Sequence, residues 1–168
     1  MVLFANVLPG SNAVQFRIRG LSPEAFRHLY GLSEQGLVAA NAIRYTANDR
    51  SGFPDRIELR DSGAGERFLL VNFVHQPTQT PYRASHAIFV REGAERPYDA
   101  LDEIPASMRT RLLSLRAFSA GDLIVDADVV EGRGARDLIL RLFSDPRTAY
   151  IHAHYAKHGC FAARIDRA

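Results

Sequence analysis

The chain has 168 residues, of which 46% are hydrophobic and 24% are charged. These proportions are typical of a folded globular protein and exclude the disordered and fibrous classes, and the length fits one domain with a single core. The net charge is only +2, and the basic residues are scattered along the chain, so nucleic acid is not expected as a partner. No apolar run approaches the roughly 18 residues that span a bilayer, so a membrane is not expected either.

The sequence predicts one domain over residues 14–168, preceded by an N-terminal extension over residues 1–13. The first nine residues are largely apolar, but this stretch is short and no Lys or Arg precedes Arg17, so we do not expect a signal peptide. Cys160 is the only cysteine, which excludes an internal disulfide. We therefore expect a cytoplasmic location.

The first half of the chain predicts both helices and strands. Apolar and polar residues alternate over residues 14–18, which indicates a first strand. Ser22, Pro23 and Glu24 are typical of a helix start, and this helix is expected to end near Tyr30. The later elements are expected as a helix at 33–40, strands at 42–46, 56–60 and 68–74, a loop at 75–85, and a strand at 87–91. The turn-forming residues between the second and third of these strands predict that those two pair as a hairpin.

The second half predicts more strands and one strong helix. Apolar residues recur at helical spacing over residues 135–143, and Asp145-Pro146 is expected to end that helix. The other elements are expected as a helical turn at 104–109 and strands at 112–118, 123–130, 150–156 and 161–165. Because most strands are joined by short turns, the sequence predicts an α+β fold with a largely antiparallel sheet and two or three helices.

Histidine is concentrated in two segments of the chain. His75 and His86 flank the polar loop, and His152, His154 and His158 lie in or just after the predicted strand at 150–156. Residues two apart in a strand project from the same face, so His152 and His154 are expected to point together. These segments therefore predict a functional site, provided that the fold brings them into contact.

The leading hypothesis is a binding or enzymatic site for a small anionic metabolite. In this hypothesis His86 and His154 transfer protons, because an imidazole titrates near neutral pH, and arginine holds the negative charge. The ligand-binding residues are expected to be His75, Arg83, Ser85, His152 and Arg164. The sequence names neither a reaction nor a cofactor, and it leaves open whether the protein is an enzyme.

Two other hypotheses remain open at this stage. Asp126 and Asp128 share one face of the strand at 123–130, so His152 and His154 could hold a divalent metal ion together with one of these carboxylates or with a third histidine. Alternating polar residues are also what an ordinary half-solvated strand shows. The third hypothesis is a noncatalytic interaction module that forms homo-oligomers.

Several long runs of the chain resemble one bacterial family, the domain of unknown function 1203 family. These runs are 71–73, 75–77, 80–90, 125–130 and 150–154, with the pairs Gly159-Cys160 and Ala163-Arg164. The resemblance extends from Phe16 to the C-terminus. It implies no activity, because the family is uncharacterised.

Overall fold

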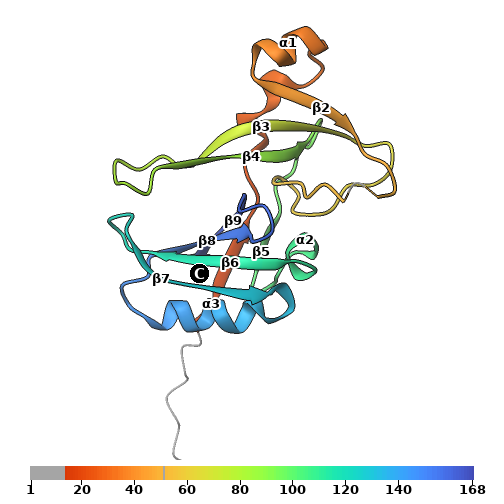
Figure 1. Ribbon diagram of the computed structural model, residues 1–168. Helices are drawn as coiled ribbons and strands as arrows, with labels where there is room; N and C mark the ends of the chain where they lie inside the picture. The colour runs from red at the N-terminus through yellow and green to blue at the C-terminus, as the bar shows by residue number, and fades with distance from the viewer. Residues whose placement is uncertain (1–13, 51) are drawn as a thin grey trace, which may run out of the picture.

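Two antiparallel sheets face each other in the computed structural model, which describes residues 14–50 and 52–168 (Figure 1). The larger sheet has the strand order β5-β1-β9-β8-β6-β7, and the smaller sheet has the order β2-β3-β4. The strands are β1 Phe16–Arg19, β2 Ala42–Thr46, β3 Arg67–Gln76, β4 Ala84–Arg91, β5 Asp99–Leu101, β6 Leu112–Phe118, β7 Ile124–Glu131, β8 Tyr150–Tyr155 and β9 Phe161–Arg167. The predicted α+β class with antiparallel sheets is confirmed, whereas the predicted extension at 1–13 lies outside the described residues.

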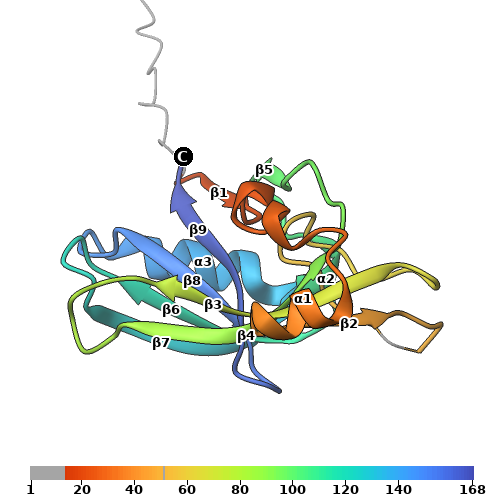
Figure 2. The same ribbon diagram turned by 90° about the horizontal axis from the view of Figure 1, so that it is seen from above.

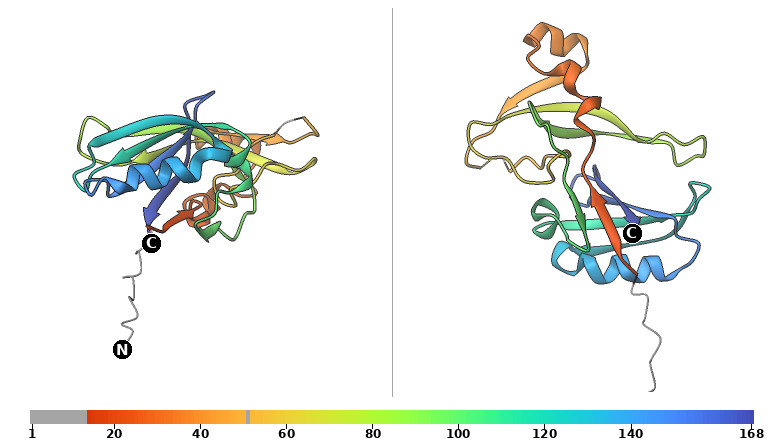
Figure 3. Two further views of the ribbon diagram at one scale, coloured as in Figure 1. Left: turned by 90° about the horizontal axis from the view of Figure 1, so that it is seen from below. Right: turned by 180° about the vertical axis from the view of Figure 1, so that it is seen from behind.

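The helices cover the outer faces of this two-layer arrangement. Helix α3 (Ala135–Ser144) lies beneath the larger sheet, and α1 (Glu34–Ala39) lies beside β2 at the far side of the smaller sheet (Figures 1 and 3). The third α-helix, α2 (Ala106–Arg109), is a single turn. Short 3-10 helices at Pro23–Ala25, Arg27–Leu29 and Gly132–Gly134 complete the set. Within the described residues, no helix is long and apolar enough to cross a membrane.

Each sheet has its own hydrophobic core. The first core lies between α3 and the larger sheet, where Leu138 and Ile139 of the helix join Ile151 and Ala153 of β8. The second core covers one face of the smaller sheet, and its one member from the larger sheet is Phe161. Viewed from above, β3 and β4 lie over β6 and β8 (Figure 2). The space between the sheets is therefore apolar only in part, which leaves room for a polar site.

Three local predictions differ from the structure. The expected strand at 56–60 is an irregular loop in which Leu59 has a positive φ of 50°, so it does not pair with β3 as a hairpin. Strand β3 instead pairs with β2 and β4. The expected helix from Ser22 to Tyr30 is two 3-10 turns, because Phe26 leaves the helical region with φ −122° and ψ −12°. Strand β5 was not predicted.

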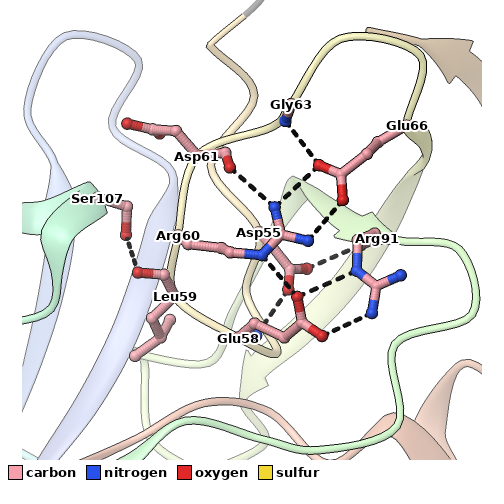
Figure 4. Close-up of polar contacts among 9 residues, drawn as sticks. All are labelled: Asp55, Glu58, Leu59, Arg60, Asp61, Gly63, Glu66, Arg91 and Ser107. Atoms are coloured by element: carbon pink, nitrogen blue, oxygen red, sulfur yellow. Dashed lines mark hydrogen bonds and ion pairs between the residues drawn. The ribbon is translucent and has the colours of Figure 1, made fainter.

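Buried and charged side chains fix the irregular loop in place (Figure 4). The carboxylate of Asp55, which is fully buried, accepts hydrogen bonds from the backbone N–H groups of Glu58 at 2.6 Å and Arg91 at 2.7 Å. The guanidinium of Arg91 pairs with Glu58, and Arg60 joins Glu58 to Glu66. Burial raises the pKa of Asp55, and backbone N–H groups, including those of Glu58 and Arg91, oppose that rise. Asp55 is therefore the acceptor that allows this loop to pack without regular secondary structure.

We expect Asp55→Ala to destabilise the fold strongly. The substitution leaves two partly buried N–H groups without their acceptor, which should lower the free energy of unfolding by about 2–4 kcal/mol. Urea unfolding followed by circular dichroism measures this loss. Asp49→Ala is the matched control, because Asp49 is exposed, and it should change stability by less than about 0.5 kcal/mol. Equal stability of the two variants would contradict this role for Asp55.

Candidate functional site

Four histidines from both sheets meet between the two layers. His75 of β3 and His86 of β4 come from the smaller sheet, and His152 and His154 come from β8 of the larger sheet. The His75 ring lies 5.6 Å from His152 and 5.2 Å from His154 between ring centroids, and its Nε2 lies 2.8 Å from Nδ1 of His86. The two histidine-bearing segments that are separate in the sequence therefore form one cluster.

Strand alternation directs these side chains toward one another. In β8, Ile151 and Ala153 belong to the core with α3, so His152 and His154 project from the opposite face. In the smaller sheet, His86 stands directly across from Phe73 and shares its face with the buried Ile88. The predicted common face of His152 and His154 agrees with this arrangement.

Three of the imidazoles lie close enough together to hold one metal ion. One nitrogen each from His75, His152 and His154 can be chosen so that all three lie within 4.8 Å of one another. Nδ1 of His154 lies 2.9 Å from the carbonyl oxygen of Gly159, so Nδ1 carries the proton and Nε2 is free to bind an ion. Nδ1 of His75 and Nδ1 of His152 are buried and have no hydrogen-bond partner among the described residues.

The environment keeps these imidazoles neutral. Burial lowers the pKa of His75 to about 4 and those of His152 and His154 to about 3, and neighbouring cationic groups lower them further. Burial also lowers the pKa of His86. A neutral imidazole is the form that binds a metal ion, because one of its two nitrogens carries no proton. At neutral pH each of these rings therefore has one nitrogen available for an ion.

Apolar side chains surround the cluster, and one arginine lies beside it. Phe161 stacks on His75 with centroids 4.8 Å apart, and Phe118 lies 5.2 Å from His152. Arg116 of β6 stands opposite His152 in the sheet, and its charge lowers the pKa of all four histidines. Arg116 is half-buried and makes no ion pair with any residue in the described part of the chain. Only one sequence pattern could have pointed to Arg116, namely its alternation with the apolar residues of β6.

A chain of hydrogen bonds closes one side of the cluster. Gln76 of β3 donates to the Tyr150 hydroxyl at 2.7 Å, and this hydroxyl donates to Asp122 at 2.6 Å. The hydroxyl of Thr80, in the loop between β3 and β4, donates to the backbone oxygen of Asp122 at 3.2 Å. The hydrogen bond from Tyr150 is the main cause of the lowered pKa of Asp122. These contacts join the two sheets, and no pattern in the sequence predicted them.

The carboxylates considered for the metal site lie elsewhere. Asp126 and Asp128 stand opposite Ala117 and Leu115, which places them on the helix-facing side of the larger sheet. There they pair with Arg141 of α3 at 2.9 and 3.1 Å. Strand β6 also separates β7 from β8, so neither carboxylate joins the histidines. Of the third ligands considered, an aspartate or a third histidine, only a histidine, His75, lies beside His152 and His154 among the described residues.

The other predicted ligand-binding residues are divided between the site and the surface. Arg164 is paired with His152 across β8 and β9, and its guanidinium lies 3.9 Å from the centroid of the Tyr150 ring, so it borders the cluster. Ser85 stands opposite Val74 and projects from the other face of the smaller sheet. Arg83 is exposed in the loop between β3 and β4.

The neutral histidines should make stability pH-dependent in metal-free protein. An unfolded histidine titrates near pH 6.5, whereas folded His152 has a pKa of about 3. Below pH 6.5 only the unfolded state takes up this proton, so His152 should lower the free energy of unfolding by up to about 1.4 kcal/mol per pH unit down to pH ~4. Urea unfolding at several pH values, with EDTA present, measures this slope.

His152→Gln should have a smaller slope than the wild type over this range. His28→Gln removes an exposed histidine and should retain the wild-type slope, so it is the matched control. If His152→Gln and the wild type lose stability in parallel as the pH falls, the buried neutral state of His152 is wrong.

Comparison with known proteins identifies a family but no activity. A family model described as protein of unknown function, DUF1203, matches residues 52–167, which include every histidine of the cluster. No curated protein and no solved structure matches the chain significantly. The match covers more than half of the sequence and agrees with the resemblance described above. The chain therefore belongs to the DUF1203 family of proteins of unknown function.

Proposed function

We propose that this protein binds one divalent transition-metal ion through His75, His152 and His154 and uses it to act on a small anionic molecule. The observation that carries the proposal is the convergence of these three imidazoles, with one nitrogen of each within 4.8 Å of the others. Two of the buried Nδ1 atoms also have no hydrogen-bond partner among the described residues.

A purely structural role explains this cluster less well. Leaving a buried polar group without a partner costs about 1–3 kcal/mol, and native proteins contain few such groups. Here two of them lie side by side on His75 and His152, and burial opposes protonation of either ring. A bound metal ion would satisfy both lone pairs at once.

The donor set favours particular ions and a particular kind of site. Nitrogen ligands suit Zn²⁺, Fe²⁺, Co²⁺, Ni²⁺ and Cu²⁺, whereas Mg²⁺ and Ca²⁺ prefer oxygen. Three protein ligands are typical of catalytic sites, because a coordination position stays open for water or substrate. All three ligands are neutral, so a bound ion would keep its full positive charge and would strongly polarise such a water molecule.

Two further residues support action on a small anion. Arg116 is a half-buried cation beside the cluster with no ion-pair partner in the described chain, so it is available to hold a carboxylate or phosphate. His86 bonds to His75 and is less buried than His152 and His154. We assign His86 the roles of orienting His75 and exchanging protons with a ligand.

We expect protein purified without an affinity tag to bind one equivalent of Zn²⁺ or Co²⁺ with a Kd below about 1 µM. His75→Ala, His152→Gln and His154→Gln should each weaken binding by more than about 100-fold, because each removes a ligand. Elemental analysis gives the stoichiometry, and a competition titration gives the affinity. The visible spectrum of bound Co²⁺ reports the coordination number.

Two substitutions serve as controls for this experiment. His28→Gln removes an exposed histidine outside the cluster and should bind metal like the wild type. His86→Phe removes only the partner of His75 and should weaken binding by about 10- to 100-fold. Absence of stoichiometric metal with every ion tested, or equal affinity in His154→Gln and His28→Gln, would overturn the proposal.

A further inference from the structure

A separate cavity of about 850 Å³ lies next to the histidine cluster. It is lined by the loop that contains Phe53 and Arg56, by residues of β4, by the segment after α2 and by the turn between β8 and β9. Its volume lies in the range of cavities that hold small organic molecules, about 300–1,000 Å³. His86 belongs to its lining, whereas His75, His152 and His154 do not.

The charged residues in the lining of the cavity are all basic. Arg56, Arg111 and Lys157 contribute positive charge, and no Asp or Glu is among the lining residues. Arg111 pairs at 2.7 Å with Asp61, which is not among the lining residues. Lys157, in contrast, has no ion-pair partner in the described part of the chain. The cavity therefore presents a positive surface that a neutral or cationic ligand would not match.

Arg56 is the most unusual of these residues. It is only 1% exposed, and its guanidinium donates to the carbonyl oxygens of Phe161 at 2.8 Å and Pro54 at 2.5 Å and to Sγ of Cys160 at 3.1 Å. None of the described carboxylates lies within ion-pair distance of it. A buried cation without a partner anion is unfavourable, and the guanidinium has further N–H groups to donate. An anionic ligand would compensate for both.

Apart from Thr110 and the two histidines His86 and His158, the remaining lining is mostly apolar and aromatic. Phe53 and Phe89 stack with centroids 4.4 Å apart, and Leu70 and Tyr155 also line the cavity. Such a surface binds the apolar part of a ligand, while the basic residues fix its charged end.

We infer that this cavity binds a small organic anion, either a carboxylate or a phosphate ester that carries an apolar group. The inference goes beyond the metal site and stands even if the protein binds no metal. Its ligand would contact His86, which connects the cavity to the histidine cluster through the 2.8 Å contact with His75.

Calorimetry on EDTA-treated protein tests the inference with probes of matched shape. Phenyl phosphate and benzoate carry both an anionic and an aromatic part, inorganic phosphate carries only the charge, and benzyl alcohol carries only the ring. At least one aromatic anion should bind with a Kd between about 10 µM and 1 mM, more tightly than phosphate or benzyl alcohol. The tighter of phenyl phosphate and benzoate shows which anion the cavity prefers.

A charge substitution locates the bound anion. Lys157→Gln should weaken binding of the preferred anion by about threefold to tenfold, and it should not affect folding because Lys157 is exposed. Arg83→Gln is the matched control, since it removes an exposed positive charge outside the cavity lining and should leave binding unchanged.

The only cysteine of the chain gives an independent readout, because Cys160 lines the cavity. A saturating concentration of the preferred anion should slow alkylation of Cys160 by iodoacetamide at least about threefold, and Lys157→Gln should require more anion for this protection. Failure of both aromatic anions to bind below about 1 mM would overturn the inference. Equal affinity for benzyl alcohol, or equal weakening by Arg83→Gln and Lys157→Gln, would do so as well.

Discussion

Strand β8 is buried on both faces, and the histidine cluster depends on how those two faces are covered. It lies in the middle of the larger sheet, between β9 and β6. One face, with Ile151 and Ala153, packs against α3 in an ordinary apolar core. The other face presents Tyr150, His152 and His154 to the smaller sheet. A strand buried on both sides is usually apolar throughout, so the polar face requires partners from the opposite layer.

The smaller sheet supplies those partners, because its inner face is apolar at one end and polar at the other. Its inner face is apolar at Leu69 and Val90, where it packs in the second core, and becomes polar toward His75 and His86. Phe161 of β9 lies at the boundary, because it belongs to that core and also stacks on His75. Phe161 connects the apolar half to the larger sheet, and the polar half contains ring nitrogens that have no hydrogen-bond partner among the described residues.

The sequence predicted those features that depend on local periodicity. The helix at 135–143 and the strands around His152 and Asp126 have clear spacing, so their positions and the faces of their side chains could be read directly. The loop at 56–60 looked like a strand because its residues alternate, but Asp55 binds backbone N–H groups that a strand would use for pairing.

Strand order could not be predicted, because it depends on contacts between segments far apart in the chain. The same sequence pattern would have allowed β7 to lie beside β8, with Asp126 near His152. The structure places β6 between them, and the helix-facing side of β7 then takes Asp126 to Arg141. The approach of His75 to β8 likewise depends on how the two sheets pack, which no local pattern encodes. The sequence therefore identified the residue types of the site, but it could not show which of these residues lie next to one another.

The contact between His75 and His86 links the proposed metal site to the cavity. If Nδ1 of His75 binds a metal ion, its Nε2 carries the proton and donates to Nδ1 of His86. Neutral His86 must then carry its own proton on Nε2, so it is a hydrogen-bond donor on its free side. A donor in the lining of a basic cavity favours an anionic ligand. Metal binding would thus fix the tautomer of His86 in the form that suits the ligand inferred for the cavity, and the two sites would favour each other's occupation.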